Sequence, residues 1–377
     1  MDEVAQRKMI RLSKSCIGEA EKKAVLGVLD REYLGMGAEV QQFEQALTEF
    51  FGRPTVCVVN GTAALHLALQ AAGVGHGDQV LVQSLTYVAS FQAISATGAT
   101  PIACDVDPLT LTLDWRDAER RLTPRTKAVM PVHYSGGVGS WNEIYEFATR
   151  NGLRVVEDAA HAFGTEYQGK RVGGSGDIAC FSFDGIKNIT AGEGGCIVTD
   201  DEEILERVRD SRLLGVKKDT EKRYAGARSW EFDVTEQGWR YHMSNIMAAI
   251  GIEQLKRYKE ISRIRQDYAS QYFNRLSTNK SLTLFEVDYE NVVPHIFPLL
   301  LPREKCRDRI RSRLGELGVE TGLHYPPCNK LSLYKSGYEL PITQDISPRL
   351  LTIPLHTGLK TTDIDFVCEK LEQVIHE

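Results

Sequence analysis

One lysine, one aspartate and one strand-to-helix turn carry most of the chemistry that this sequence offers. Lys187 lies in a turn between an apolar segment and a glycine-rich one, where enclosure would lower the pKa of its amine, as a Schiff-base nucleophile requires. Asp158 ends an apolar run, the position at which open α/β sheets place their ligand crevices, and a carboxylate there can hold a heteroaromatic nitrogen protonated. Asn60-Gly61-Thr62 opens an Ala-rich segment, so its backbone N–H groups could bind an anion.

Each of these features also has an ordinary structural explanation. The turn at 60–62 could be a simple helix N-cap, Asp158 could cap a helix beside a packed His161, and a lysine in a loop is usually just solvated. Taken together they favour chemistry, because pyridoxal phosphate needs one partner each for its phosphate, its ring nitrogen and its aldehyde. Tyr87 could add an aromatic face for stacking, although a lone tyrosine is commonly a core or surface residue.

The elements that must position these residues follow an alternating pattern. From about residue 18 to residue 199, short apolar runs alternate with longer amphipathic segments, which predicts strands joined by crossover helices. We predict helices at 63–72, from a capping box at Ser140 towards residue 150, and at 204–212 after a second capping box at Thr199. This indicates an α/β fold with a mostly parallel sheet. The predicted strands are 55–59, 79–83, 100–104, 127–132, 154–157, 178–183 and 195–199.

After about residue 244 the pattern changes. It predicts a long helical stretch through residue 276, and the apolar part at 246–255 suits packing between domains or subunits. The charged stretch 217–229 lacks an apolar face and is predicted to be an exposed loop. We expect an N-terminal arm (1–17), a large α/β domain (18–244) and a smaller C-terminal α+β domain (245–377). The other elements predicted here are strands at 282–287 and 292–301 and helices near 303–317 and 362–375.

Composition narrows the functional classes. Hydrophobic residues make up 42% and charged residues 25% of the chain, as in soluble globular proteins. The net charge of -6 offers no general attraction to nucleic acid or anionic lipid. The eight cysteines lack any zinc spacing, so we expect reduced thiols and no metal site. We find no signal peptide and no apolar run of bilayer length, and we expect a cytoplasmic protein without a membrane partner.

The sequence resembles the DegT/DnrJ/StrS family of sugar aminotransferases, which have fold type I of the pyridoxal phosphate enzymes. This resemblance implies a large domain with a mostly parallel sheet between helices, a smaller C-terminal domain, and a homodimer with its active sites at the interface. The likeness runs nearly the full length and rests on Asn60-Gly-Thr-Ala-Ala-Leu, Glu157-Asp-Ala-Ala-His-Ala, Phe181-Ser-Phe with Lys187-Asn-Ile and Gly192-Glu-Gly-Gly, Met243-Ser-Asn-Ile-Met-Ala-Ala-Ile-Gly, and His324-Tyr-Pro.

The resemblance also implies individual roles. Lys187 would form the Schiff base with pyridoxal phosphate, and Asp158 would pair with the nitrogen of its ring. His161 would lie beside the phenolic oxygen of the ring, and Tyr87 would stack on the ring face. The phosphate would be held by Gly61, Thr62 and Ser182.

The predicted reaction moves an amino group from an amino acid, glutamate or glutamine, to a keto sugar carried on a nucleotide, for amino sugar biosynthesis such as that of O-antigen or other polysaccharides. Two short segments resemble members of the family that aminate C4 of a 6-deoxy-4-keto hexose more than they resemble members that act at C3. These segments are residues 188–195 and His133-Tyr134-Ser135-Gly136. Two alternatives stay open. A sugar 3-dehydratase would have histidine at the position of Lys187, and a non-enzymatic regulator that binds the cofactor would not need the intact lysine, aspartate and phosphate turn.

The sequence departs from the family pattern just ahead of Met243. Many members read Asn-Tyr-Arg-Met, whereas this chain has Arg240-Tyr241-His242, so the usual asparagine contact from the partner subunit is in doubt. Arg240 could contact a phosphate or carboxylate instead, or form an interface ion pair. His-Tyr-Pro could be a simple turn, and flexibility alone could explain the glycines around residue 36. The candidate substrate-binding residues are Met36, Arg240, His242, His324 and Tyr325.

Overall fold

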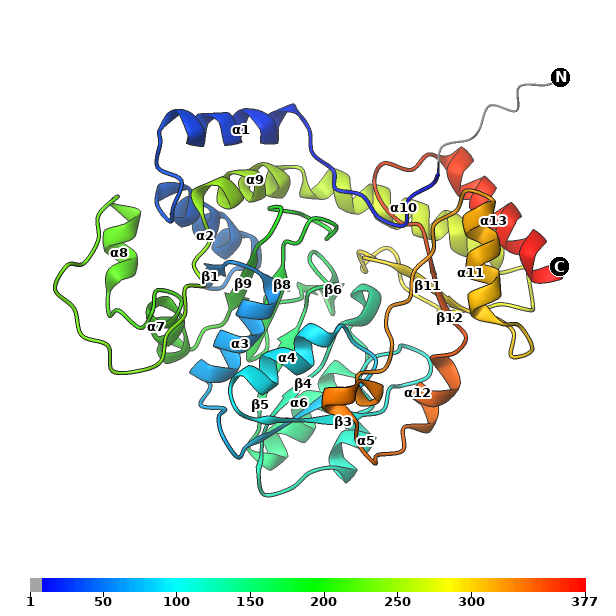
Figure 1. Cartoon of the computed structure of the whole chain (residues 1–377), viewed down its shortest axis with the longest axis horizontal. Helices are drawn as coiled ribbons and strands as arrows, with labels where there is room; N and C mark the ends of the chain where they lie inside the picture. The colour runs from blue at the N-terminus through cyan, green and yellow to red at the C-terminus, as the bar shows by residue number, and fades with distance from the viewer. Residues whose placement is uncertain (1–8) are drawn as a thin grey trace.

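A seven-stranded sheet forms the centre of the fold in the computed structural model, which describes residues 9–377 (Figure 1). The strands follow the order β1-β9-β8-β5-β4-β2-β3, and within this sheet only β9 pairs antiparallel with its neighbours. The predicted α/β class with a mostly parallel sheet is confirmed. The strands are β1 (Thr55–Val58), β2 (Gln79–Gln83), β3 (Thr100–Cys104), β4 (Thr126–Met130), β5 (Arg154–Asp158), β8 (Ile178–Ser182) and β9 (Gly195–Val198).

Helices cover both faces of the sheet because its strands carry apolar side chains on both sides. Val156 of β5 packs among residues of α3, α4 and α7, whereas the preceding Val155 packs on the opposite face with α5 and α6. α2 covers the second face beside them, and α9 and α1 pack in turn over α2 (Figure 1). These helices are α1 (Glu19–Asp30), α2 (Ala38–Phe51), α3 (Gly61–Ala71), α4 (Val88–Ala96), α5 (Trp115–Arg120), α6 (Trp141–Asn151), α7 (Glu202–Ser211) and α9 (Asn245–Lys256).

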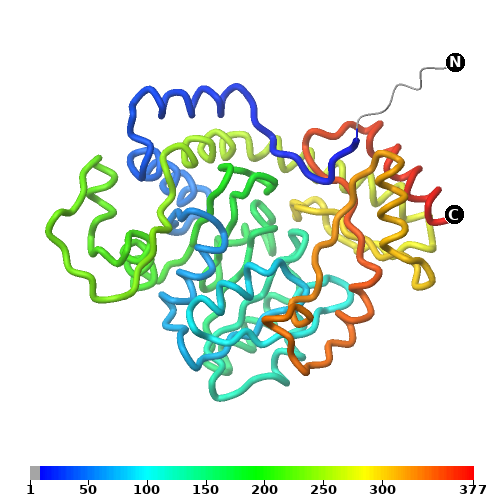
Figure 2. Tube along the Cα trace, viewed as in Figure 1, coloured from blue at the N-terminus to red at the C-terminus, as the bar shows by residue number. Residues whose placement is uncertain are grey.

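A second, antiparallel sheet with its own apolar core follows towards the C-terminus (Figure 2). Its three strands are β10 (Thr283–Leu284), β11 (Phe297–Leu300) and β12 (Leu350–Ile353), and the helices beside it are α10 (Tyr258–Leu276), α11 (Arg307–Glu316) and α13 (Thr361–His376). Short elements outside these layers include the hairpin β6 (Glu166–Tyr167) and β7 (Lys170–Arg171), the helices α8 (Asp219–Tyr224) and α12 (Pro341–Ile346), and the 3-10 helices η1 (Tyr134–Gly136), η2 (Cys328–Lys330) and η3 (Ser332–Tyr334). Among the helices within residues 9–377, none is long and apolar enough to cross a membrane.

The segment that precedes α1 runs from the C-terminal sheet towards the turn that carries Lys187 (Figure 2). The N–H of Leu355 donates to the carbonyl oxygen of Leu12 over 3.1 Å, and the hydroxyl of Ser15 donates to the carbonyl oxygen of Gly185 over 2.5 Å. The predicted arm spans residues 1–17, of which 1–8 lie outside the described residues. Its described part therefore supports the backbone close to Lys187.

The prediction of a bare loop at 217–229 is wrong, because this stretch contains the helix α8 (Asp219–Tyr224). Its charges are used internally: the carboxylate of Asp219 accepts a hydrogen bond from Arg223 over 2.7 Å. At the end of this helix, the Tyr224 hydroxyl accepts a hydrogen bond over 3.0 Å from the fully buried guanidinium of Arg212, which also donates to the Glu44 carboxylate over 2.5 Å. A helix held by buried polar contacts shows no apolar stripe in its sequence.

Both predicted capping boxes fail in detail. Ser140 does precede α6, but its side chain makes no capping hydrogen bond. Before α7 the N-cap is Asp201, whose carboxylate accepts from the N–H of Ile204 over 3.2 Å, while the hydroxyl of Thr199 donates to the carbonyl oxygen of Asp177 over 2.9 Å. A carboxylate closer to the helix end therefore replaces the threonine.

The predicted bounds are least accurate in the C-terminal part. The long helical stretch is two helices that meet at Arg257, and the strands predicted at 282–287 and 292–301 shrink to β10 and β11. Several elements were missed altogether: α1, α2, α4, α5, α12, β6, β7 and β12. Signals were present for two of them, since Val40, Phe43 and Leu47 recur at helical spacing in α2 and Asp114 caps α5.

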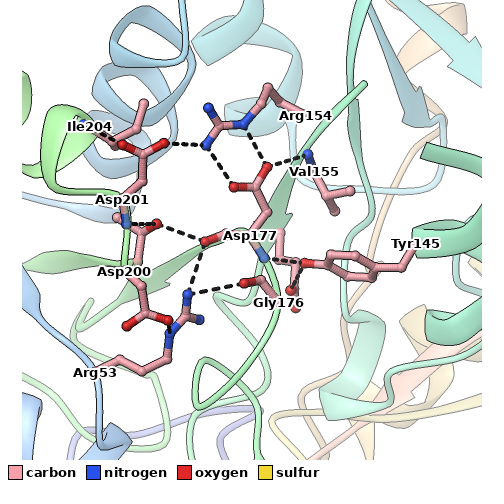
Figure 3. A network of polar contacts seen from close by, with 11 residues as sticks. Arg53, Tyr145, Arg154, Val155, Gly176, Asp177, Asp200, Asp201 and Ile204 are labelled. Carbon is pink, nitrogen blue, oxygen red and sulfur yellow. Dashed lines mark hydrogen bonds and ion pairs between the residues drawn. The ribbon is translucent and has the colours of Figure 1, made fainter. Parts of the chain in front are cut away.

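A polar network joins the ends of β5, β8 and β9 to the residues that precede β1 (Figure 3). The Arg154 guanidinium binds both carboxylate oxygens of Asp177, over 2.8 and 2.7 Å, and reaches Asp201 over 3.1 Å. Arg53 donates to Asp200 over 2.7 Å. Because Arg154 and Asp177 stand at the amino ends of their strands, the network fixes these strands at the edge opposite their carboxyl ends.

Candidate active site

A cavity of about 480 Å³ opens at the carboxyl ends of the parallel strands, where open α/β sheets bind their ligands. It brings together residues from β5, β8, the start of α3 and the segment at 324–325. Most of the predicted site residues line it. They are Gly61, Thr62, Tyr87, Asp158, His161, Ser182, Lys187, His324 and Tyr325.

Asp158 is the last residue of β5 and is 5% exposed. Its carboxylate accepts hydrogen bonds from the hydroxyl of Ser90 over 2.7 Å and from the N–H of Ala160 over 3.2 Å. Burial raises the pKa of this carboxyl group above its ordinary value, while the Ser90 hydroxyl and the charge of Lys187 oppose the rise. Both hydrogen bonds favour the ionised form, which a protonated ring nitrogen would need as its partner.

Lys187 lies half-buried in the turn that follows β8. Burial lowers the pKa of its amine from 10.5 to about 8, with Asp158 and Asp184 opposing the shift and the guanidinium of Arg265 adding to it. Arg265 is itself buried and donates to the carbonyl oxygen of Ile186 over 3.4 Å, which supports the backbone next to the lysine. A fraction of Lys187 is therefore a free amine near neutral pH.

The turn between β1 and α3 forms a narrow cradle. Asn60 caps α3 with a 2.8 Å hydrogen bond from the N–H of Ala63 to its side chain, which leaves the N–H groups of Gly61 and Thr62 in the first turn without intrahelical acceptors. A Cβ atom at Gly61 would stand 2.8 Å from the Cβ of Ser182. Only glycine lets the two strand ends approach this closely, so backbone donors and a serine hydroxyl converge on one anion-sized space.

His161 lies on the cavity wall between two hydrogen bonds. The N–H of Ser135 donates to its Nδ1 over 3.4 Å, and its Nε2 is 2.9 Å from the hydroxyl oxygen of Tyr325. Burial lowers the pKa of the imidazole well below its ordinary value, and the charge of Lys187 adds to this effect. In the neutral ring Nδ1 accepts, so the hydrogen sits on Nε2 and is donated to Tyr325.

Two aromatic side chains stand at the open side of the cavity. The ring of Tyr87, which is 59% exposed, lies 5.5 Å from the ring of Tyr325 between centroids. Nδ1 of His324 is 3.0 Å from the Thr352 hydroxyl, and the carbonyl oxygen of His324 accepts from the hydroxyl of Tyr134. His-Tyr-Pro is thus a turn that also places two side chains at the site.

Three predicted substrate-binding residues lie outside this cavity. Met36 is 1% exposed and packs in the apolar cluster around α2, which leaves no surface for a substrate within the chain. Arg240 is exposed, and His242 is half-buried beside it, where burial and the charges of Arg240 and Arg223 lower the pKa of the imidazole to about 4. Their segment is joined to the strand that precedes the 60–62 turn, because the carbonyl oxygen of Tyr241 accepts from the N–H of Val59 over 2.7 Å.

The cavity also contains functional candidates that the sequence did not reveal. His295 is 3% exposed, and its ring centroid lies 4.4 Å from that of His161. Asp184 and Glu193 line the wall near Lys187, and Ser90 contacts Asp158 from α4. Asp184 and Glu193 flank Lys187 in sequence and could have been suspected, whereas His295 and Ser90 lie in segments without any motif.

The side chains that line this cavity include more anions than cations. Among its lining residues, three carry carboxylates, Asp158, Asp184 and Glu193, whereas Lys187 is the one cation and no arginine is present. Within residues 9–377 no group of three or more histidine, cysteine, aspartate or glutamate side chains could hold a metal ion. Anionic ligands would depend on backbone N–H groups and on cations from elsewhere.

The residues present fit pyridoxal phosphate. A buried carboxylate that accepts hydrogen bonds from Ser90 and Ala160 matches the ring nitrogen, a lysine with a lowered pKa matches the aldehyde, and the glycine cradle of the β1–α3 turn matches the phosphate. Lys187 and Asp158 would hold the cofactor from its two ends, and Gly61, Thr62 and Ser182 would hold its phosphate.

Known proteins share this fold. The model of the DegT/DnrJ/EryC1/StrS aminotransferase family matches residues 15–372. The structure of the aminotransferase TlmJ from Streptoalloteichus hindustanus is 33% identical, with a TM-score of 0.90 over 98% of this chain and 99% of that chain. PseC from Helicobacter pylori, an aminotransferase involved in the biosynthesis of pseudoaminic acid, is 26% identical, with a TM-score of 0.90 over 98% and 100%. NtdA from Bacillus subtilis, solved with the bound cofactor PMP, is 27% identical, with a TM-score of 0.87 over 99% and 87%.

The lowered pKa of Lys187 predicts when its amine reacts. In the cofactor-free protein, acylation of Lys187 should rise with pH and reach half its maximal rate at about pH 8, because only the deprotonated amine is a nucleophile. Lys22 is the control, since its hydrogen bond with Glu19 raises the pKa of its amine above 10.5. Mass spectrometry of both peptides after brief labelling measures the two profiles. Labelling of Lys187 and Lys22 at the same pH would contradict the electrostatic account of the cavity.

Proposed function

We propose that this chain, which belongs to the DegT/DnrJ/EryC1/StrS aminotransferase family, transfers an amino group from glutamate to C4 of a 6-deoxy-4-keto hexose carried on a nucleotide. The chain is an enzyme, a sugar aminotransferase that depends on pyridoxal phosphate. The donor, the ring position and the nucleotide carrier are our proposal. The transfer of an amino group is supported by one observation above all: Lys187, Asp158 and the 60–62 turn line the same cavity.

Pyridoxal phosphate, when bound, draws electrons from the α carbon of an attached amino acid and so makes the proton of this carbon acidic. Asp158 would keep the ring nitrogen protonated from its fixed place at the end of β5, where Ser90 and Ala160 orient its oxygens. A neutral residue at this position could not stabilise that charge.

Lys187 would have two tasks. Its Nζ would hold the cofactor in the resting enzyme, and once free it would move the proton from the α carbon of the amino acid to the cofactor. In the second half of the cycle the same amine would move a proton from the cofactor to the sugar carbon that takes up the amino group. A pKa near 8 suits this work, because the best proton carrier has a pKa close to the working pH.

Neutral imidazoles would complete the wall around the ring. His161 would lie beside the phenolic oxygen, with its orientation fixed by Ser135 and Tyr325. Burial also lowers the pKa of His295 well below its ordinary value, and the nearby charge of Lys187 lowers it further. Keeping these rings uncharged limits the positive charge near Lys187.

A hexose substrate and its ring position are supported by one feature each. The sequences of residues 188–195 and of His133-Tyr134-Ser135-Gly136 resemble those of family members that act at C4. Asp184 and Glu193 line the wall near Lys187 and could accept hydrogen bonds from the hydroxyl groups of a hexose. We also propose a place in the cytoplasm, where nucleotide sugars would feed the synthesis of polysaccharides such as O-antigen. The relative PseC is involved in the biosynthesis of pseudoaminic acid.

We further propose that the enzyme is a homodimer whose partner supplies the missing cations. The cavity contains one lysine and no arginine among its lining residues, although the cofactor, the donor and the nucleotide all carry negative charge. The segment 217–240 carries exposed basic side chains, of which Arg240 is one, and exposed apolar ones, of which Trp230 is 86% and Phe232 61% exposed. A subunit interface would cover these apolar side chains and bring the cations to the neighbouring cavity.

The function is tested by the position of the new amino group. Incubation with glutamate and a nucleotide-linked 6-deoxy-4-keto hexose should yield a 4-amino sugar, identified by NMR, and Lys187→Ala should abolish turnover without unfolding the chain, because its turn lies outside the cores. Amination of a 3-keto sugar but not of the 4-keto sugar would contradict the ring position, and normal turnover by the Lys187→Ala variant would contradict the role of the lysine.

The dimer is tested by complementation. Lys187→Ala and Arg240→Ala should each be nearly inactive, and a mixture of the two proteins that is allowed to exchange subunits should regain activity, because one of the two sites in each hybrid is intact. Lys187→Ala mixed with Asp158→Asn is the matched control and should stay inactive, since both residues belong to the same side of one site. A monomer by sedimentation, or equal recovery in both mixtures, would contradict shared active sites.

A further inference from the structure

A second, smaller cavity of about 50 Å³ adjoins the active-site cavity. We call it the rear cavity. Ile186, His295 and His324 line both cavities, so these three residues form the wall between them. The other lining residues come from the segment before α1, from β12 and from positions next to β11 and β12: Leu12, Ser13, Ile296, Thr352, Ile353 and Leu355.

His295 has a buried nitrogen without a partner. The residue is 3% exposed, and Nδ1 of its ring has no hydrogen-bond partner within residues 9–377. Burial holds the pKa of the imidazole well below its ordinary value, and the charge of Lys187 lowers it further, so the ring is neutral. Each nitrogen of a neutral imidazole either donates or accepts a hydrogen bond. Because buried polar atoms are normally paired with protein or with ordered water, Nδ1 lacks the partner that its burial requires.

The rear cavity has the size and polarity that suit water. One molecule takes up about 30 Å³ in the liquid and makes about three hydrogen bonds when it is buried in a protein. Ser13, His295, His324 and Thr352 bring polar groups to this cavity, and Nδ1 of His324 is 3.0 Å from the Thr352 hydroxyl. Its other lining residues are all leucine or isoleucine. With no charged residue in this lining, a small neutral ligand fits better than an ion.

Amino transfer needs water close to the cofactor. When the keto acid leaves, the oxygen of one water replaces the cofactor nitrogen in the double bond to the α carbon, and both hydrogens of the water go to that nitrogen. The second half of the cycle runs this step backwards and releases a water. Tyr87 and Tyr325 stand at the open side, where substrates would enter, so a bound substrate would separate the reacting bond from water on that side.

We propose that the rear cavity binds the water that amino transfer consumes and releases, and that Nδ1 of His295 holds this water. The inference rests on the proposed function, because only that reaction gives the water a chemical role. The rear cavity adjoins the Lys187 turn through Ile186. Because His295 lines both cavities, a water bound to it has one side chain to pass on its way to the reacting bond.

The site is tested by a crystal structure of the full chain with pyridoxal phosphate. We expect an ordered water about 3 Å from Nδ1 of His295. The water should be lost in Ser13→Leu, because the larger side chain would fill the cavity. Lys14→Leu is the matched control: it places the same side chain on the next residue, which is exposed and lines neither cavity, and the water should remain.

The role of the water is tested by two rates after rapid mixing of the holoenzyme with glutamate. Loss of the long-wavelength absorbance band of the lysine-bound cofactor precedes the use of water, whereas release of the keto acid follows it. A coupled NADH-dependent dehydrogenase measures only the released acid. In Ser13→Leu and in His295→Phe this release should slow about tenfold, while loss of the band changes by less than about twofold. Lys14→Leu should alter neither rate, and His295→Gln, whose amide can bind water, should stay close to the wild type.

The proposal would be wrong if the wild-type structure had no water at Nδ1 of His295. Equal slowing of both rates in Ser13→Leu, or wild-type release of the keto acid in that variant despite loss of the water, would also overturn it. So would a His295→Gln variant as slow as His295→Phe. If His295→Phe does not fold, Ser13→Leu still decides. Failure of the proposed function looks different, because no amino donor would then change the absorbance of the wild type, while the crystal structure would still show whether the water is bound.

Discussion

The structure depends on keeping an ionised carboxylate and a partly deprotonated amine in one enclosed cavity. Burial acts on the two groups in opposite directions: it raises the pKa of Asp158 and lowers that of Lys187, so each loses its charge more readily than in water. For the amine this loss is useful, since a nucleophile needs its lone pair. For the carboxylate it must be resisted, and the hydroxyl of Ser90 and the N–H of Ala160 do so from directly beside it.

The remaining architecture can be read as support for these two groups. Parallel strands end at one edge, which brings Asp158 from β5 and the Lys187 turn after β8 to the same cavity. The network of Arg53, Arg154 and Asp177 fixes the strands from the far edge. Arg265 and the segment before α1 hold the backbone just ahead of Lys187, at Ile186 and Gly185. Such contacts cost conformational entropy, but they leave the reacting groups little freedom to move.

The central sheet and the principal residues of the site could be predicted from the sequence because each depends on local signals. Apolar runs mark the strands, Asp158 ends one such run, and Lys187 lies in the turn after another. Residues that meet only through the fold could not be predicted. His295 reaches the cavity, and Ser90 reaches the Asp158 carboxylate, from segments without a motif, and α8 is held by the buried Arg212 rather than by an apolar stripe. Met36 shows the opposite case, because its glycine-rich surroundings suggest a binding loop while its side chain packs in the core.

The proposed reaction requires that the cofactor alternate between its aldehyde and amine forms in this cavity. The most direct measurement is the absorbance spectrum of the holoenzyme during two additions. Glutamate should convert the long-wavelength band of the lysine-bound cofactor into the shorter-wavelength band of its amine form, and a nucleotide-linked 4-keto sugar should then restore the first band. A spectrum that no amino donor changes, or an amine form that no keto sugar reconverts, would contradict the central claim.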